Sequence, residues 1–284
     1  MQKVWFITGS SRGLGRALAE AVLARGDRLV ATARDPKAVA DLVESAPDRA
    51  IAVPLDVTDP TQAAAAVDAA KQAFGRIDVL VNNAGYADNG SFEEMPADAF
   101  AAQIDTNMWG VINMTRAVLP VLHEQHAGHI IQISTIGGRR GFPGLSGYHT
   151  AKFAVEGFSE TLAAEIAPLG LKLTIIEPGG FRTDWAGSSM RHFQWGPDYE
   201  PSVGMMAKLA RGHEPVGDPA KAAQAIIEVA DADEPPLRLP LGNDAVDLIR
   251  AGDHAKLAEI DRWEELSRST DHDDAVPYDL NAIA

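Results

Sequence analysis

The chain of 284 residues contains no cysteine. Disulfides, iron–sulfur ligation, thiolate zinc sites and thiol nucleophiles are therefore excluded, and any chemistry must use other side chains. Long hydrophobic runs are also missing: apolar runs such as Val79-Leu80-Val81 are far too short to cross a bilayer, so we expect no membrane partner. The N-terminal residues lack the long apolar stretch of a signal peptide, which predicts a cytoplasmic protein.

Positive charge is scarce as well, with 25 Lys and Arg against 40 Asp and Glu and a formal net charge of −15. Such a surface disfavours binding to nucleic acid phosphates or anionic lipid, although a local basic pocket for a small anion stays open. The hydrophobic share of 46% and the charged share of 23% are ordinary for a soluble globule.

Apolar runs alternate with longer alanine-rich segments of helical period. This alternation is typical of βαβ units, and it predicts one α/β domain: a Rossmann-type, doubly wound, mostly parallel sheet of seven strands with helices on both faces. The strands are expected at Val4–Thr8, Arg28–Ala33, Ala50–Leu55, Val79–Asn82, His129–Ser134, Leu171–Glu177 and near Leu237–Leu239. The helices are expected at Leu14–Ala24, Pro36–Glu44, Thr61–Phe74, Ala97–His123, Tyr148–Ala167 and Pro219–Ala230.

Two regions break the alternation. Residues 180–217 are rich in glycine, proline, methionine and aromatics, and an irregular stretch of this length is more often a lid or binding loop than a connector. The catalytic unit is expected to span residues 1–240. Residues 241–284 form an extension, with an amphipathic helix at Ala255–Leu266 and an acidic tail.

A glycine-rich turn, Thr8-Gly9-Ser10-Ser11-Arg12-Gly13-Leu14-Gly15, lies between the first expected strand and the first expected helix. A dinucleotide pyrophosphate approaches backbone N–H groups at such a turn. The second strand then ends in Ala33-Arg34, where an acidic residue would bind a ribose hydroxyl and a basic residue would accept a 2′-phosphate. With Arg12 approaching from the opposite side, NADP(H) is favoured over NAD(H).

Two further strand ends carry polar residues. Asp56 in Leu55-Asp56-Val57 is expected either to contact the adenine amino group or to cap the next turn. The turn Asn82-Asn83-Ala84-Gly85 is expected either to approach the adenine ribose or to hold neighbouring backbone.

Tyr148 and Lys152 lie four residues apart, so a helix would place them on one face. The ammonium would then favour the ionised phenol and let it exchange a proton near neutral pH.

These motifs, in this order, resemble the classical short-chain dehydrogenase/reductase family: TGSSRGLG, NNAG, the asparagine of Thr106-Asn107-Met108, YHTAK, and Pro178-Gly179. The resemblance covers about the first 240 residues. It implies that Tyr148 is the general acid/base, that Lys152 tunes it and holds the nicotinamide ribose, and that Asn107 fixes a relay water. It implies cofactor contacts from Gly9, Ser11, Arg12, Gly13, Leu14, Gly15, Arg34, Asp56, Val57, Asn83, Ala84, Gly85, Tyr148, Lys152, Pro178, Gly179 and Thr183.

The catalytic hydroxyl is the point at which this chain departs from the family pattern. The strand ends in Ser134-Thr135, and the usual spacing of about thirteen residues before the tyrosine selects Thr135. A loop adjustment of one residue would select Ser134 instead, so both remain candidates.

The sequence thus predicts an NADP(H)-dependent oxidoreductase acting on a carbonyl or secondary alcohol, with a bulky hydrophobic ketone favoured. The substrate contacts are expected from Tyr86, Trp185, Met190 and Phe193. His149 and His192 lack ligand spacing, and no metal is expected. A non-catalytic redox sensor and an epimerase or dehydratase of the same fold are the alternatives. The family resemblance suggests a homodimer or homotetramer packed through the helices that begin near Ala97 and Tyr148.

Overall fold

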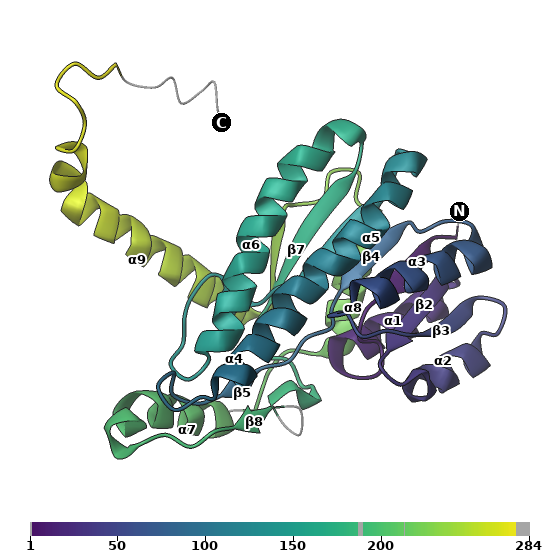
Figure 1. The fold of residues 1–284 in the computed structure, drawn as a ribbon, viewed down its shortest axis with the longest axis horizontal. Coiled ribbons are helices and arrows are strands. Elements are labelled where there is room, and N and C mark those ends of the chain that lie inside the picture. The colour runs from purple at the N-terminus through teal and green to yellow at the C-terminus, as the bar shows by residue number, and fades with distance from the viewer. Residues whose placement is uncertain (1, 187–189, 213, 277–284) are drawn as a thin grey trace.

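The protein is described here by a computed structural model that covers residues 2–186, 190–212 and 214–276. Seven parallel strands form its central sheet (Figure 1). From one edge to the other they are β3 (Ala50–Pro54), β2 (Arg28–Ala33), β1 (Val4–Ile7), β4 (Val79–Asn82), β6 (His129–Ile133), β7 (Lys172–Pro178) and β9 (Arg238–Leu241). The expected division at residue 240 therefore falls inside the last strand.

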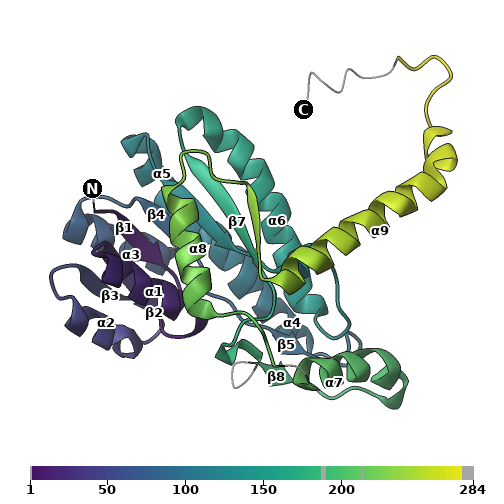
Figure 2. The ribbon, with the colours of Figure 1, turned by 180° about the vertical axis from the view of Figure 1, so that it is seen from behind.

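Helices cover both faces of this sheet. Figure 2 shows α1 (Gly13–Arg25) and α8 (Pro219–Asp231) together on one face. The opposite face carries α3 (Pro60–Phe74), α5 (Gly110–Gln125) and α6 (Ser146–Ile166) (Figure 1). The prediction of a single doubly wound Rossmann-type domain is confirmed.

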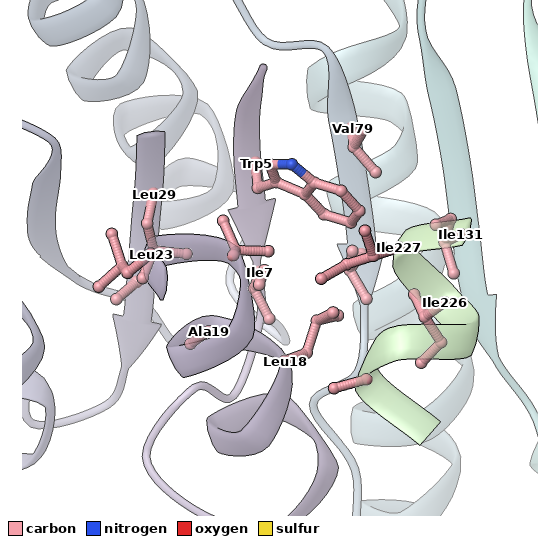
Figure 3. Close-up of a cluster of buried hydrophobic side chains, with 14 of the residues drawn as sticks. Trp5, Ile7, Leu18, Ala19, Leu23, Leu29, Val79, Ile131, Ile226 and Ile227 are labelled. Atoms are coloured by element: carbon pink, nitrogen blue, oxygen red, sulfur yellow. The ribbon is translucent and has the colours of Figure 1, made fainter. Parts of the chain in front are cut away.

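Strand β1 shows how the sequence divides the core between the two faces. Side chains alternate along a strand, so Trp5 and Ile7 enter the cluster under α1 and α8, whereas Val4 and Phe6 enter the cluster under α3, α5 and α6. All four side chains are fully buried. Figure 3 shows Trp5 and Ile7 packed with Ile226 and Ile227 of α8. A strand buried on both faces must be continuously apolar, as this one is.

The helix expected at Ala97–His123 is present, but it is not a regular α-helix throughout. It divides into α4 (Ala97–Ile104), a π-helical turn at Asp105–Trp109, and α5. The expected helix at Pro36–Glu44 likewise begins as a 3₁₀ turn, Pro36–Val39, before α2 (Ala40–Ser45). Hydrophobic periodicity does not distinguish these helix types.

Between residues 180 and 217, the described residues (180–186, 190–212 and 214–217) contain more regular structure than the sequence suggested. They contain short 3₁₀ and π turns, the strand β8 (Arg191–His192) and the helix α7 (Met205–Gly212). β8 pairs with β5 (Asp88–Asn89) in a small separate sheet. The fully buried Asp88 forms a bidentate ion pair with Arg191, with Nε 3.0 Å from Oδ1. This segment is therefore attached to the loop that follows β4.

The C-terminal helix is much longer than expected. α9 spans Asn243–Arg268, and it projects from the body in both views (Figures 1 and 2). Its first half is attached to the body: Asp244 accepts a 2.7 Å hydrogen bond from the Gly180 N–H, and Asp253 forms an ion pair with Arg139 at 2.6 Å. Helix α9 is amphipathic, and none of the helices in the described ranges is long and apolar enough to cross a membrane.

Candidate active site

The tyrosine and lysine predicted from their spacing lie in the first turns of α6. Both side chains are buried, and the Lys152 Nζ lies 5.7 Å from the centroid of the Tyr148 ring. The ammonium donates a 2.7 Å hydrogen bond to the backbone carbonyl of Ile133, the last residue of β6. Helix α6 is thus tied to the carboxyl end of a central strand.

Of the two candidate hydroxyls, the structure brings Thr135 to the phenol. Thr135 donates to the Pro178 carbonyl at 3.3 Å, and its side chain lies close enough to Tyr148 to lower the pKa of the phenol. Ser134 is buried on the other side of the chain, where its Oγ would lie 2.5 Å from a Cβ built on Gly138. The period of two along an extended strand separates these neighbours.

Burial controls the ionisation of the pair. It raises the pKa of Tyr148, and the nearby Thr135 side chain only partly opposes that rise. This direction is opposite to the one expected from the neighbouring ammonium, because Lys152 faces the ring and the phenol is removed from water. Burial also lowers the pKa of Lys152 to about 8, against a raising effect of Glu156.

Asn107 lies in the π turn between α4 and α5 and is fully buried. Its Nδ2 donates to the carbonyls of Tyr86 and Gln103 at 2.8 and 2.9 Å, and its Oδ1 accepts from the Tyr86 N–H at 3.2 Å. A Cβ on Gly85 would lie 2.5 Å from that oxygen and 3.8 Å from the Lys152 ammonium. The π turn therefore brings Asn107 to the NNAG turn and close to Lys152.

The glycine turn has the form of an anion site. Gly9 and Gly13 have φ values of +67° and +61°, which favour glycine. A Cβ on Gly15 would overlap the Asn83 amide, whose Nδ2 donates to the carbonyls of Thr8 and Gly9. The start of α1 has no capping side chain and no acid in its first turn. These free N–H groups fit the pyrophosphate of a dinucleotide.

Around this turn, Arg12 and Arg34 are both exposed, and within the described part of the chain neither guanidinium has an ion-pair partner. The Asp56 Oδ1 accepts from the N–H and hydroxyl of Thr58, so this side chain forms the local turn that was one of its two expected roles. Val57 is buried against Gly110, where a Cβ would lie 2.5 Å away. Ser11 and Leu14 are partly buried, and Leu14 packs on the core.

The far side of the site is formed by the segment that follows β7. Thr183 lies across the glycine turn, since a Cβ on Gly13 would be 3.6 Å from its Cβ. The Trp185 ring packs against the Tyr148 ring at a centroid distance of 5.3 Å. Tyr86 is partly buried, and burial raises the pKa of its phenol. The Gly179 N–H bonds to the Leu241 carbonyl at 2.9 Å, which places the Pro178-Gly179 turn beside β9.

Other expected substrate contacts lie less close to the phenol. Phe193 packs against Gly90, where a Cβ would be 2.9 Å from its own Cβ, and its backbone N–H bonds to Asn89. It therefore attaches the loop to the body. Met190 is partly buried. A hollow of about 590 Å³ lies beside this region, lined by His149 and Phe142 among others, but Tyr148 and Thr135 are not part of its wall.

The two histidines have structural positions. His149 is buried and accepts a 3.1 Å bond from the Phe142 N–H, and burial lowers its pKa to about 4. His192 is exposed on β8. Among the described residues, no group of three His, Asp or Glu side chains lies close enough together to hold a metal ion.

Comparison with known proteins decides the family. Residues 3–193 match the model of the short chain dehydrogenases. The chain belongs to the short-chain dehydrogenase/reductase family. It is 48% identical over 271 residues to oxidoreductase BOA17 of Botryotinia fuckeliana, covering 94% of this chain and 98% of the relative. A short-chain dehydrogenase structure from Streptomyces avermitilis is 43% identical with a TM-score of 0.90, over 95% of this chain and 98% of that one.

A relative with a more specific name is the 3-ketodihydrosphingosine reductase of Bacteroides thetaiotaomicron. It is 35% identical over 243 residues, covering 84% of this chain and 88% of the relative. The protein is thus an oxidoreductase of the short-chain dehydrogenase/reductase family, whose members use a nicotinamide cofactor.

A buried group of charges behind the family site was not predicted from the sequence. Glu156 and Glu177 are buried at 5% and 0% exposure, and Arg139 and Arg238 contact them. The spacing of four residues from Lys152 to Glu156 was visible in the sequence, and it is the same signal that identified Tyr148 with Lys152.

We predict that His149 makes stability depend on pH. Its pKa is near 4 in the fold and about 6.5 when unfolded, so its contribution is complete above pH 6.5 and is lost as the pH falls from 6.5 toward 4. Between pH 7 and 5, the free energy of unfolding should fall by about 2 kcal/mol less in His149→Asn than in the wild type. Urea unfolding measures this, with the exposed His192→Asn as control. Equal falls in all three proteins would contradict the prediction.

Proposed function

We propose that the protein is an NADP(H)-dependent reductase of bulky hydrophobic ketones, which also oxidises the corresponding secondary alcohols. The observation that carries the proposal is the convergence of Tyr148, Thr135 and Lys152 on one side of the glycine turn, with Asn107 beside the lysine. A phenol, a hydroxyl and an ammonium in this order can bind a carbonyl oxygen and give it a proton.

The bound nicotinamide would supply or accept the hydride. Tyr148 would donate the proton that the carbonyl oxygen takes up in reduction, and it would remove the proton of the alcohol in oxidation. The Thr135 hydroxyl, already close to the phenol, would hold the same oxygen. Lys152 would hold the nicotinamide ribose and stabilise the phenolate, and Asn107 would fix a water that reloads the lysine. The upward pKa shift of Tyr148 keeps its proton in place until a substrate oxygen needs it.

The choice of a bulky, apolar ketone rests on the side chains that surround the phenol. Trp185 lies against the Tyr148 ring and is 36% exposed, so an apolar group can bind beside it at little cost. Tyr86 contributes a second partly buried ring near the same site. The name of the related 3-ketodihydrosphingosine reductase, which specifies a keto substrate, is consistent with this choice.

The preference for NADP(H) rests on Arg12 and Arg34. Both guanidinium groups lie at the adenosine end of the expected cofactor position, and both are exposed with no ion-pair partner among the described residues. A 2′-phosphate would give them a charge-assisted contact that a ribose hydroxyl cannot give.

Loss of the phenolic hydroxyl should abolish turnover. In Tyr148→Phe we expect kcat for NADPH-dependent ketone reduction to fall at least about 100-fold, while NADPH affinity stays within a few-fold. Nicotinamide absorbance and fluorescence titration measure these quantities. If the variant retains wild-type turnover, the acid is another group; if neither protein turns over any ketone although both bind NADPH, the sensor alternative is supported.

Loss of the Arg34 guanidinium should weaken the selection of NADPH over NADH. We expect Arg34→Ala to raise the KM for NADPH about tenfold and to leave the KM for NADH nearly unchanged, because only the former carries the phosphate. The control is Arg28→Ala, because Arg28 begins β2, whereas Arg34 follows its other end. A parallel rise for both cofactors would rule out a phosphate contact.

We also propose that the protein assembles as a homodimer or homotetramer through α4, α5 and α6. Trp109 of the π turn between α4 and α5 and Phe153 of α6, 46% and 44% exposed, provide apolar surface there. We expect Phe153→Glu to reduce the mass measured by light scattering. The control is Leu266→Glu, since Leu266 is 61% exposed near the far end of α9. A reduced mass in the control alone would assign the contact to α9 instead.

A further inference from the structure

The buried face of α6 carries three ionisable side chains spaced one turn apart: Tyr148, Lys152 and Glu156. Each is at most 6% exposed. Residues four apart on a helix are neighbours, with Cβ atoms about 5–6 Å apart. The carboxylate therefore follows the ammonium along the helix just as the ammonium follows the phenol.

The carboxylate of Glu156 is held in place from β9. Its Oε2 accepts a 3.0 Å hydrogen bond from the Arg238 Nε. Its Oε1 has no hydrogen-bond partner among the described residues and lies 3.1 Å from the position of a Cβ on Gly138. That position is also 2.5 Å from the Ser134 Oγ, so the carboxylate reaches the end of β6. The Lys152 ammonium donates its hydrogen bond to the carbonyl of Ile133, which is the residue before Ser134.

The ionisable and polar groups near Lys152 come from α6 itself, from the π turn and from β7. On α6 itself these are Tyr148 and Glu156, and the π turn contributes the uncharged Asn107. From β7 comes Glu177, whose pKa is raised by burial and by Glu156.

The two arginines that complete this group bind carboxylates. Arg139 donates to the Glu177 Oε1 at 3.0 Å, and the Arg238 Nε is 3.7 Å from the same oxygen. Of these two carboxylates, Glu156 is the one whose negative charge raises the pKa of Lys152. An ammonium buried in this way loses its proton more easily unless an anion remains close by.

We propose that Glu156 is a positioning residue for the reduction: held by Arg238, its carboxylate keeps the Lys152 ammonium protonated beside Tyr148 over the working pH range. It acts through Lys152 and touches neither substrate nor cofactor. This inference rests on the proposed function, since it assigns a role in that same site.

Glu160 provides a matched control. It lies one turn beyond Glu156 and accepts a 2.7 Å hydrogen bond from the Arg238 Nη2, but it is exposed. Glu160→Gln therefore removes a carboxylate from the same arginine and leaves the neighbour of Lys152 in place. A purely structural role in tying β9 to α6 would affect both variants alike.

The test is the pH profile of kcat for NADPH-dependent reduction in the wild type, Glu156→Gln, Glu156→Asp and Glu160→Gln. We expect the midpoint of the alkaline limb to move to lower pH by about half a unit to one unit in Glu156→Gln, because the ammonium is lost sooner. Glu156→Asp should recover most of this shift, and Glu160→Gln should show none. An unmoved midpoint in Glu156→Gln, with kcat lowered equally at every pH, would overturn the proposal.

A readout without turnover separates this proposal from the proposed function. The ionisation of Lys152 can be followed by NMR in the NADPH-bound protein with isotope-labelled lysine, the signal being assigned by its loss in Lys152→Met. If no ketone is reduced, the proposed function fails, but a lower midpoint for Lys152 in Glu156→Gln still supports the role of Glu156. If Glu156→Gln does not fold, Glu156→Ala carries the test, because it also removes the carboxylate, and an unchanged Lys152 midpoint in it would count against the proposal.

Discussion

The common direction of the seven strands is the constraint on which the site depends. In a parallel sheet every carboxyl end lies at the same edge, so residues far apart in sequence are collected there by the backbone alone. The glycine turn follows β1, Arg34 follows β2, the NNAG turn follows β4, Thr135 follows β6, and the Pro178-Gly179 turn ends β7. The bond from Lys152 to the Ile133 carbonyl adds α6 to this edge. A single antiparallel strand in the middle of the sheet would remove one of these contributions.

The elements that were predicted accurately are those in which burial dictates composition. Strands such as β1 and β6 are buried on both faces, and their predicted bounds differ from the observed ones by a single residue. Three local features were not predicted: a π turn inside a helix, the start of the last helix, and a pair of two-residue strands. The π turn at Asp105–Trp109 lies inside the helix expected at Ala97–His123, and α9 begins twelve residues before the helix expected at Ala255–Leu266. The pairing of β5 with β8 joins dipeptides with no strand signal.

The site, too, could be predicted from the sequence only in part. Spacing of four on a helix identified Tyr148 and Lys152, and the alternation of a strand accounts for why adjacent Ser134 and Thr135 face opposite ways. The spacing favoured Thr135 but left Ser134 open, because the hydroxyl that faces the phenol depends on where the strand ends. The sign of the Tyr148 pKa shift was also misjudged. Local charge can be inferred from neighbours in sequence, whereas removal from water depends on the whole fold.

The π turn has a further consequence for how this site can change. A π turn holds one residue more than an α-helix of the same rise. Removing that residue would restore regular hydrogen bonding to the α4–α5 helix, but it would also rotate everything on one side of the cut by roughly 100°. Asn107 would then leave the backbone of Tyr86, to which two of its atoms are bonded. A regular α-helix at this position would therefore remove the hydrogen bonds between Asn107 and Tyr86, so the site requires the π turn.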